Sequence, residues 1–263
     1  MRRVMCFPCA GDTLVGTLDT PDTGPPGKTG LLIVSGGNEI RIGAHRGMAL
    51  LAQNLAARGI PVFRFDRRGV GDSTGTNGGF LSSGPDIGCA AATFSAEMGI
   101  ERLVAFGNCD AATALALFGQ AAGIDRLILA NPWVVEPSDD LPPAAAIRSR
   151  YAEKLKDPRE VWRLVSGGVN IAKLAKGLTR VAAAPSEPNE LALRLSAALQ
   201  KWQDRVTILL AAGDSTAIAY RDAMARIGLS LPTFTRNTAS HSFAREGDAA
   251  WLEERIVAAL AER

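Results

Sequence analysis

The chain has 263 residues, of which 47% are apolar and 21% are charged, and its formal net charge is +2 at pH 7. This length fits one large domain or two small ones, and the ordinary globular composition excludes disordered and fibrous architectures. The near-neutral charge excludes a large polyanionic partner, so we expect neither nucleic acid nor an anionic membrane surface as a ligand.

Short apolar runs of strand length alternate with longer helical patterns through most of the chain. An antiparallel hairpin is predicted at residues 4–8 and 14–19, turned at Gly11-Asp12. The later runs predict a parallel sheet with helices on both faces, which makes a mostly parallel sheet of eight strands. The remaining predicted strands are residues 31–35, Val62–Phe65, 103–106, 127–130, Val206–Ala211 and Thr233–Arg236, and the predicted helices are residues 47–58, 86–98, 110–121, 217–227 and Asp248–Ala261.

The alternation is interrupted after Trp133. Residues 134–204 contain proline-rich turns and helical stretches at 145–155 and Glu190–Trp202, but no convincing strand. We therefore expect an α/β core formed by residues 1–133 and 205–263, with residues 134–204 as a helical cap insertion between the sixth and seventh strands.

Membrane insertion and export are not predicted. The apolar stretches are all far shorter than the ~18 residues of a membrane-spanning helix. The four cysteines are unevenly spaced, which is not typical of a disulfide scaffold. We expect a cytoplasmic protein with reduced thiols.

A predicted strand-to-helix turn has the pattern of a nucleophile elbow. Its sequence Gly107-Asn108-Cys109-Asp110-Ala111 is G-x-C-x-A, with cysteine where the common G-x-S-x-G pattern has serine. Small residues two positions before and after the nucleophile permit the tight turn, and the helix N-terminus attracts negative charge on the sulfur. An isolated string of this kind also fits a buried structural cysteine, so the partners of the thiol decide between the two interpretations.

An acid and a histidine follow at the ends of later predicted strands. Asp214 comes after Val206–Ala211, and His241 comes after Thr233–Arg236. Nucleophile, then acid, then histidine is the chain order of one known catalytic triad, in which the histidine accepts the nucleophile's proton and the acid orients the ring. We predict that Cys109, His241 and Asp214 form such a triad and that it requires no metal and no cofactor.

Backbone N–H groups are expected to bind the oxyanion that forms when Cys109 attacks a carbonyl. The N–H of Asp110, which directly follows the nucleophile, is one predicted donor. The loop after residues 31–35 supplies the second, with Gly37 as the first choice and Asn38 as the neighbouring alternative. An ordinary glycine turn is the competing interpretation of this loop.

Four further residues are candidates for substrate contact. Arg41, His45 and Arg46 lie near the oxyanion loop and fit an anionic substrate group, although they equally fit the solvated start of a helix. Trp133 borders the insertion, where an aromatic side chain either lines a pocket or simply packs. The chain has only two histidines, and His45, the one outside the predicted triad, has no acid after it at triad spacing.

Other motifs have structural interpretations. Residues 66–73 match a D-x-R-G-x-G-x-S stretch that we interpret as an Asp–Arg pair with turn glycines. Cys6 and Cys9 form a C-x-x-C on a predicted strand, and no second ligand pair accompanies them, which favours structural cysteines over a zinc or redox site. Cys89 lies within a helical pattern and is expected in the core.

With these residues the chain resembles the α/β-hydrolase superfamily over nearly its whole length, and more narrowly the exosortase A system-associated hydrolase 1 family. The resemblance rests on Gly36-Gly37-Asn38, on Arg41 and residues 43–46, on residues 66–73 and on residues 107–111. It implies an α/β-hydrolase fold. Members of the narrower family accompany genes for exopolysaccharide synthesis and protein sorting in Gram-negative bacteria. Cysteine in place of serine departs from the superfamily's usual pattern and is shared with dienelactone hydrolase-like enzymes.

The sequence therefore leads to the hypothesis of a cysteine-dependent hydrolase that cleaves an ester, thioester or lactone of a small acyl substrate through an acyl-enzyme on Cys109. Two alternatives remain open. One is an acyltransferase that uses the same triad, and the other is a ligand-binding protein of the same fold with little turnover. No oligomeric state is predicted.

Overall fold

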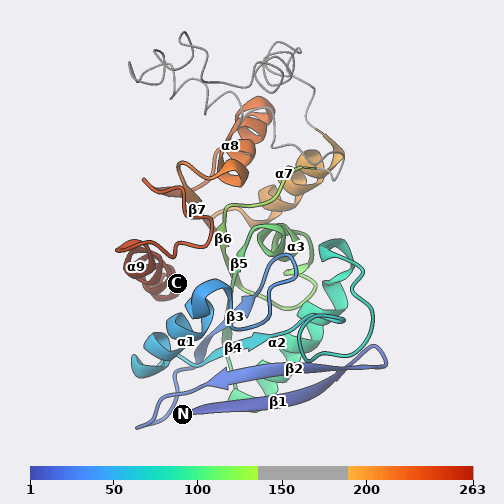
Figure 1. Cartoon of the computed structure of the whole chain (residues 1–263), viewed down its shortest axis with the longest axis vertical. Coiled ribbons are helices and arrows are strands. Elements are labelled where there is room, and N and C mark those ends of the chain that lie inside the picture. The colour runs from blue at the N-terminus through green and yellow to red at the C-terminus, as the bar shows by residue number, and fades with distance from the viewer. Residues whose placement is uncertain (136–188, 263) are drawn as a thin grey trace, which may run out of the picture.

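The computed structural model describes residues 1–135 and 189–262, which form an eight-stranded sheet covered by helices (Figure 1). The strands are β1 (Arg2–Cys9), β2 (Asp12–Asp19), β3 (Thr29–Val34), β4 (Val62–Phe65), β5 (Arg102–Asn108), β6 (Arg126–Ala130), β7 (Val206–Ala211) and β8 (Thr233–Arg236). Their order in the sheet is β1-β2-β4-β3-β5-β6-β7-β8. The pairs β1–β2 and β2–β4 are antiparallel and the other pairs are parallel, so the predicted hairpin and parallel sheet are both confirmed.

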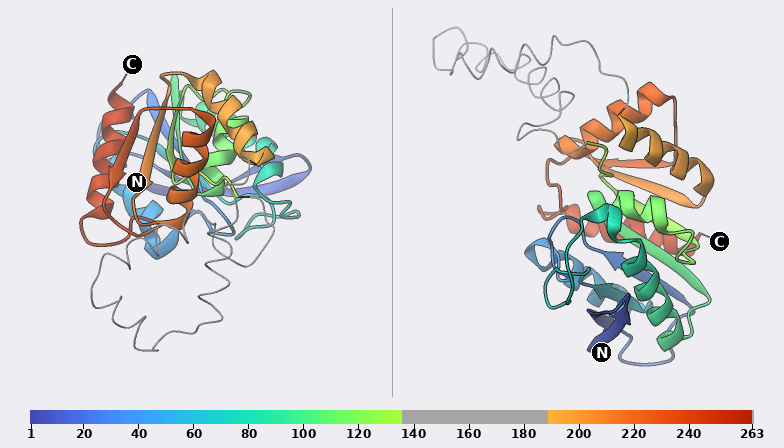
Figure 2. Two further views of the ribbon diagram at one scale, coloured as in Figure 1. Left: turned by 90° about the horizontal axis from the view of Figure 1, so that it is seen from above. Right: turned by 90° about the vertical axis from the view of Figure 1, so that its right-hand side faces the viewer.

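Helices lie on both faces of the sheet, as predicted. The α-helices are α1 (Gly47–Ala57), α2 (Gly84–Met98), α3 (Asp110–Phe118), α7 (Glu190–Trp202), α8 (Ser215–Ile227) and α9 (Asp248–Ala261), and the short 3₁₀ turns are η1 (Ala44–Arg46) and η2 (Phe80–Ser82). Helices α1 and α9 pack on one face, and α2, α3, α7 and α8 on the other (Figure 2). Every residue of β6 and β7 is buried, as expected for central strands with a helix layer on each side.

Helices α1, α2, α3 and α8 each differ from the prediction at one boundary, by one to three residues. Helix α3 ends at Phe118 rather than at residue 121, and the chain passes through Gly119, where a Cβ would lie 3.0 Å from the Trp202 ring. Helix α8 begins at Ser215 rather than at residue 217, because the Asp214 side chain accepts hydrogen bonds from the first N–H groups of the helix.

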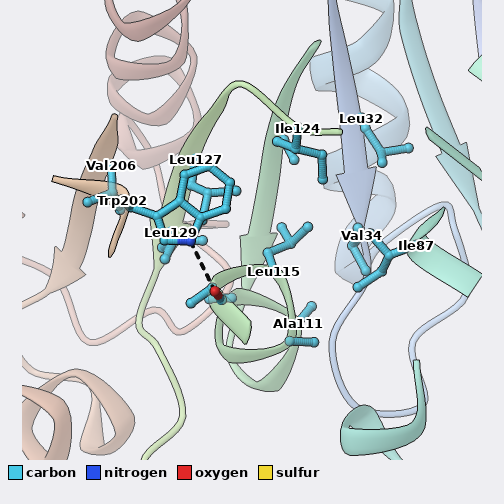
Figure 3. Packing of buried hydrophobic residues seen from close by; sticks show 14 of the residues in the cluster. Leu32, Val34, Ile87, Ala111, Leu115, Ile124, Leu127, Leu129, Trp202 and Val206 are labelled. Carbon is cyan, nitrogen blue, oxygen red and sulfur yellow. Dashed lines mark hydrogen bonds between the residues drawn. The ribbon is translucent and has the colours of Figure 1, made fainter. Parts of the chain in front are cut away.

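Helix α7 belongs to the core layer. Trp202 has no exposed surface, and its indole N–H donates to the Ala116 carbonyl of α3 at 3.0 Å (Figure 3). The predicted insertion of residues 134–204 therefore shares its last helix with the core. Its other predicted helix, residues 145–155, lies outside the described residues.

The chain leaves and rejoins the described core at one place. The Asn189 side-chain amide, at the N-cap of α7, donates to the Val134 carbonyl at 2.8 Å. Residues 135 and 189 are the last and first described residues on either side of this hydrogen bond. Within the described ranges, the helices are too short or too polar to cross a bilayer.

Replacing Trp202 with alanine tests the position of α7. The substitution removes a buried indole and its hydrogen bond to α3, and we expect it to lower the free energy of unfolding by about 3–5 kcal/mol. Leu193→Ala, on the exposed side of the same helix, is the matched control and should change it by about 0.5 kcal/mol or less. Urea unfolding followed by circular dichroism measures both, and equal losses would contradict the packing of α7 on α3.

Candidate active site

The turn between β5 and α3 holds Cys109 in a backbone conformation that few L-amino acids adopt. Its φ is 63° and its ψ is −129°, a strained combination of the kind that costs roughly 1–3 kcal/mol. The helix starts so close to the strand that a Cβ at Gly107 would lie 2.9 Å from the Ala111 carbonyl carbon. Glycine at position 107 thus permits the sharp turn that presents Cys109 at the carboxyl edge of the sheet.

A histidine and a buried carboxylate lie at the same edge. Asp214 follows β7 and His241 follows β8, and the His241 Nδ1 atom is 3.0 Å from Asp214 Oδ2. The same Oδ2 accepts hydrogen bonds from the N–H groups of Thr216 and Ala217, each at 3.1 Å. Asp214 is therefore the N-cap of α8, and the first turn of that helix holds the carboxylate in position.

Asp214 and Cys109 are the two neighbours that favour the protonated form of the His241 ring. Burial by itself lowers the pKa of the imidazole, but the interactions with Asp214 and Cys109 outweigh it and raise the pKa of His241 to about 10. Burial raises the pKa of Asp214, yet that pKa lies below its usual value because His241 and two backbone N–H groups bind the carboxylate. The ring consequently stays protonated through the neutral pH range.

A fully buried asparagine joins the three loops that carry these groups. Asn131, just after β6, has a φ of 42° and no exposed surface. Its Nδ2 donates to the His241 carbonyl at 3.0 Å and to Asn108 Oδ1 at 3.2 Å, and its Oδ1 accepts from Ala211 N–H at 2.9 Å. Asn108 Nδ2 donates to the same His241 carbonyl at 3.1 Å. One amide thus connects the elbow, the strand that leads to Asp214 and the loop that carries His241.

Sequence reasoning missed Asn131 and also two other anchors of the histidine loop. Gly213 N–H donates to the Thr238 carbonyl at 2.8 Å, which ties the acid loop to the histidine loop. Phe243 has a φ of 54°, and its ring stacks on Trp251 with 5.6 Å between centroids. The available sequence signals were an Asn-Pro pair and a lone aromatic residue, which occur in many turns and cores.

The predicted oxyanion loop lies directly against the elbow. A Cβ at Gly36 would be 2.5 Å from the Asn108 carbonyl oxygen, so this approach requires glycine. Gly37 follows with a φ of 57°, and its N–H donates to Asp110 Oδ1 at 2.6 Å. Gly37, the first choice for the second oxyanion donor, is therefore engaged by a neighbouring carboxylate. Among the described residues, the backbone N–H groups of Asp110 and Asn38 have no acceptor.

Arg41 has a structural role that sequence reasoning did not assign. Its guanidinium is ion-paired with the fully buried Asp66 and with Asp72 at 3.0 Å, and its Nε donates to Thr17 Oγ1 at 3.0 Å. This arginine therefore holds the loop after β4, and its side chain is committed to these partners rather than to a substrate anion. We expected an Asp–Arg pair within residues 66–73, but Asp66 pairs with Arg41, which lies outside that stretch.

Of the other candidate substrate contacts, Trp133 lies next to the elbow, whereas His45 and Arg46 lie on an exposed turn. Trp133 N–H donates to the Cys109 carbonyl at 3.2 Å, and the Trp133 carbonyl accepts from Thr113 Oγ1 at 2.7 Å, so Trp133 borders the elbow. His45 and Arg46 are exposed and have positive φ values of 52° and 61°. Within the part of the chain that the structure describes, neither of them forms an ion pair.

The other thiols have surroundings that differ from those of Cys109. Burial and the adjacent Cys89 thiol raise the pKa of Cys9 to about 12, so this side chain stays protonated in the core. Cys6 is exposed on β1, and all four cysteines are free. These positions fit the structural interpretation of the C-x-x-C pattern.

Solved structures share this architecture at low sequence identity. DcsB in complex with a substrate analogue superposes with a TM-score of 0.66 and 12% identity, covering 99% of both chains. An α/β serine hydrolase homologue from Coxiella burnetii gives 0.63 and 15%, covering 98% of this chain and 97% of that one. An α/β serine hydrolase without a lid from Xanthomonas campestris gives 0.61 and 15%, covering 98% and 93%. The chain has the α/β-hydrolase fold. No protein-family model and no curated protein matches its sequence.

The α/β-hydrolase fold explains why residues distant in sequence meet. Parallel strands of an open sheet end at one edge, where loops from different strands form a common site. In this chain, β3 leads to Gly37, β5 to Cys109, β7 to Asp214 and β8 to His241. The arrangement places a thiol, an imidazole, a carboxylate and backbone N–H groups together, which are the groups required for nucleophilic attack on a carbonyl.

Replacing Asn131 with alanine removes the amide that connects these loops. We expect the free energy of unfolding to fall by about 1–3 kcal/mol because the buried Ala211 N–H loses its acceptor. Asn77→Ala removes two exposed hydrogen bonds, one to Asn38 (2.8 Å) and one from the Gly79 N–H (3.0 Å), and should cost about 0.5 kcal/mol or less. Urea unfolding measures both variants, and an equal effect of the two would argue against the connecting role of Asn131.

The raised pKa of His241 makes stability depend on pH. A pKa of about 10 in the folded chain against 6.5 ordinarily means that the stabilisation is complete below pH 6.5 and is lost as the pH rises towards 10. Asp214→Asn keeps a capping side chain but removes the charge that raises this pKa. The free energy of unfolding should therefore fall more steeply between pH 6.5 and 10 in the wild type than in Asp214→Asn. Parallel curves from urea titrations would show that the pair is not responsible.

Proposed function

We propose that the chain is a cysteine-dependent hydrolase that cleaves an ester, thioester or lactone through an acyl-enzyme on Cys109. The observation that carries this proposal is the His241–Asp214 pair, 3.0 Å apart, which lies at the same edge of the sheet as Cys109 on its strained elbow, with Asp214 fixed as a helix cap. The α/β-hydrolase fold supports a hydrolase in general, and the residues at the carboxyl edge support this particular chemistry.

The protonated state of His241 suggests how the first step proceeds. A cationic imidazole beside Cys109 stabilises the thiolate, which attacks the substrate carbonyl carbon and forms the C–S bond. The carbonyl electron pair moves to oxygen and is stabilised by the Asp110 N–H and by a second donor, Gly37 or Asn38. When the intermediate collapses, the leaving alkoxide or thiolate takes the proton from His241.

The second step hydrolyses the acyl-enzyme. Neutral His241 removes a proton from water, and the resulting hydroxide adds to the thioester carbonyl. Collapse of this second intermediate breaks the C–S bond and releases the carboxylic acid. The thiolate and the imidazolium are then restored, and Asp214 orients the ring throughout because its own position is fixed by α8.

The remaining elements of the proposal concern the substrate and its surroundings. The substrate is a small acyl compound, with Trp133, His45 and Arg46 as candidate contacts and with a contribution from the predicted cap. No cofactor is part of the proposal, and the protein is expected in the cytoplasm. Membership of the exosortase A system-associated hydrolase 1 family is part of the same proposal, and it rests on the motifs at residues 36–46, 66–73 and 107–111.

Intact-mass labelling tests the nucleophile. Incubation with a panel of acyl thioesters and p-nitrophenyl esters should add one acyl group to the wild type, and peptide mapping should place it on Cys109. Cys109→Ala should lose the adduct and at least about a thousandfold in turnover. Cys6→Ala removes an exposed thiol that is distant from Cys109 in the sequence. This variant is the control, and it should be acylated to the same extent as the wild type. An acyl group on any other residue would overturn the mechanism.

A further inference from the structure

The Asp110 carboxylate binds one of the backbone N–H groups that are expected to bind the oxyanion. Asp110 Oδ1 accepts the Gly37 N–H at 2.6 Å, while the Asp110 backbone N–H stands at the start of α3. A developing oxyanion at Gly37 would have to share this donor with a negatively charged side chain, and the two charges repel each other. In the free protein the Gly37 N–H, the first choice for the second donor, is therefore already bound by a carboxylate.

A buried arginine lies beside the same carboxylate and is incompletely satisfied. Arg67 is 5% exposed, and its Nη2 contacts the Gly37 carbonyl and lies 3.9 Å from Asp110 Oδ2. That separation allows ionic attraction but is too long for a hydrogen bond. Its Nη1 is buried and has no hydrogen-bond partner among the described residues. Such an unpaired buried donor is rare and calls for a partner.

We propose that Asp110 and Arg67 form a two-position switch at the oxyanion hole, an inference that rests on the proposed function. In the free protein the Asp110 carboxylate binds the Gly37 N–H. When the carbonyl oxygen of a substrate takes that N–H, the carboxylate turns to Arg67 and forms the hydrogen bonds that the guanidinium lacks. Only hydrogen bonds are exchanged, and no proton or covalent bond moves in this step.

The surroundings of Asp110 permit such a movement. A Cβ at Gly36 would lie 2.8 Å from Asp110 Oδ1, so the absence of a side chain at position 36 is what allows the carboxylate to reach the Gly37 N–H. The Asp110 side chain is 16% exposed, whereas Arg67 is almost fully enclosed. The arginine is therefore the fixed member of the pair and the aspartate the moving one. Arg67 thereby acts as a positioning residue, since it affects the reaction by drawing Asp110 away from Gly37.

The switch predicts an unusual relation between two substitutions. Arg67→Met removes the second position of the carboxylate, so Asp110 remains on Gly37 and acylation of Cys109 slows by about 100-fold, the loss typical of one oxyanion donor. Adding Asp110→Ala to Arg67→Met frees Gly37, and the double variant should acylate at least about tenfold faster than Arg67→Met alone. If both residues merely supported the loop, the double variant would be as slow as Arg67→Met or slower.

The experiment measures the burst of p-nitrophenolate from p-nitrophenyl butyrate over a range of ester concentrations, which separates the acylation rate constant from binding. Arg68→Met is the matched control, because Arg68 pairs with Asp86 at 2.6 Å and contacts neither Gly37 nor Asp110. It should acylate like the wild type. Thermal unfolding of each variant shows whether a slow rate comes from loss of structure.

If Arg67→Met does not fold, two substitutions at Asp110 replace it. Asp110→Asn keeps an acceptor for Gly37 but loses the charge attracted to Arg67, so it should acylate more slowly than Asp110→Ala. The opposite order overturns the switch. In either series, if Cys109 is acylated but the rates do not follow the expected order, the switch is wrong and the proposed function still stands. Failure of the wild type to acylate Cys109 overturns the proposed function and the switch together.

Discussion

Cys109 can occupy its strained turn of positive φ only because positions 36 and 107 carry no side chain. A Cβ at Gly107 would meet the start of α3, and one at Gly36 would meet the Asn108 carbonyl. The elbow, the helix and the oxyanion loop therefore approach within van der Waals contact of each other's backbone. This closeness brings a thiol and two sets of backbone N–H groups within reach of a single carbonyl group, so the proposed chemistry depends on it.

Electrostatics then determines the state of the groups gathered there. Asp214 serves both as the cap of α8 and as the partner of His241, so the helix that it stabilises also holds it in the orientation that the ring requires. The result is a histidine that remains cationic at neutral pH next to a thiol. Cys9 lies in a different environment, where burial beside a second thiol raises its pKa and keeps it protonated.

Sequence patterns sufficed for the parts of the fold that depend on local periodicity. The apolar runs of β3, β5, β6 and β7 are buried on both faces, and such runs between helical patterns are distinctive. The elbow and the residues after β7 and β8 could be selected because strand ends meet at one edge of a parallel sheet. In each case the signal lies within a few neighbouring residues.

Other features depend on contacts that no local pattern encodes. Arg41 pairs with Asp66 and Asp72, which lie far from it in the sequence. Without these partners in view, the cationic cluster near the oxyanion loop had the pattern of a substrate site. Helix α7 is amphipathic like a cap helix, and only the packing of Trp202 on α3 assigns it to the core. The bond between Gly37 and Asp110 depends on one side-chain rotamer, which spacing alone does not determine.

The hydrogen bond from Asn189 to the Val134 carbonyl has a consequence for how this chain can diverge. It joins the two stems directly, so residues of the described core set the spacing between them. A change of length between the stems that keeps this hydrogen bond would also keep Trp133 beside the elbow. A lineage could therefore exchange the segment between the stems to suit a new substrate and inherit the proposed triad unchanged.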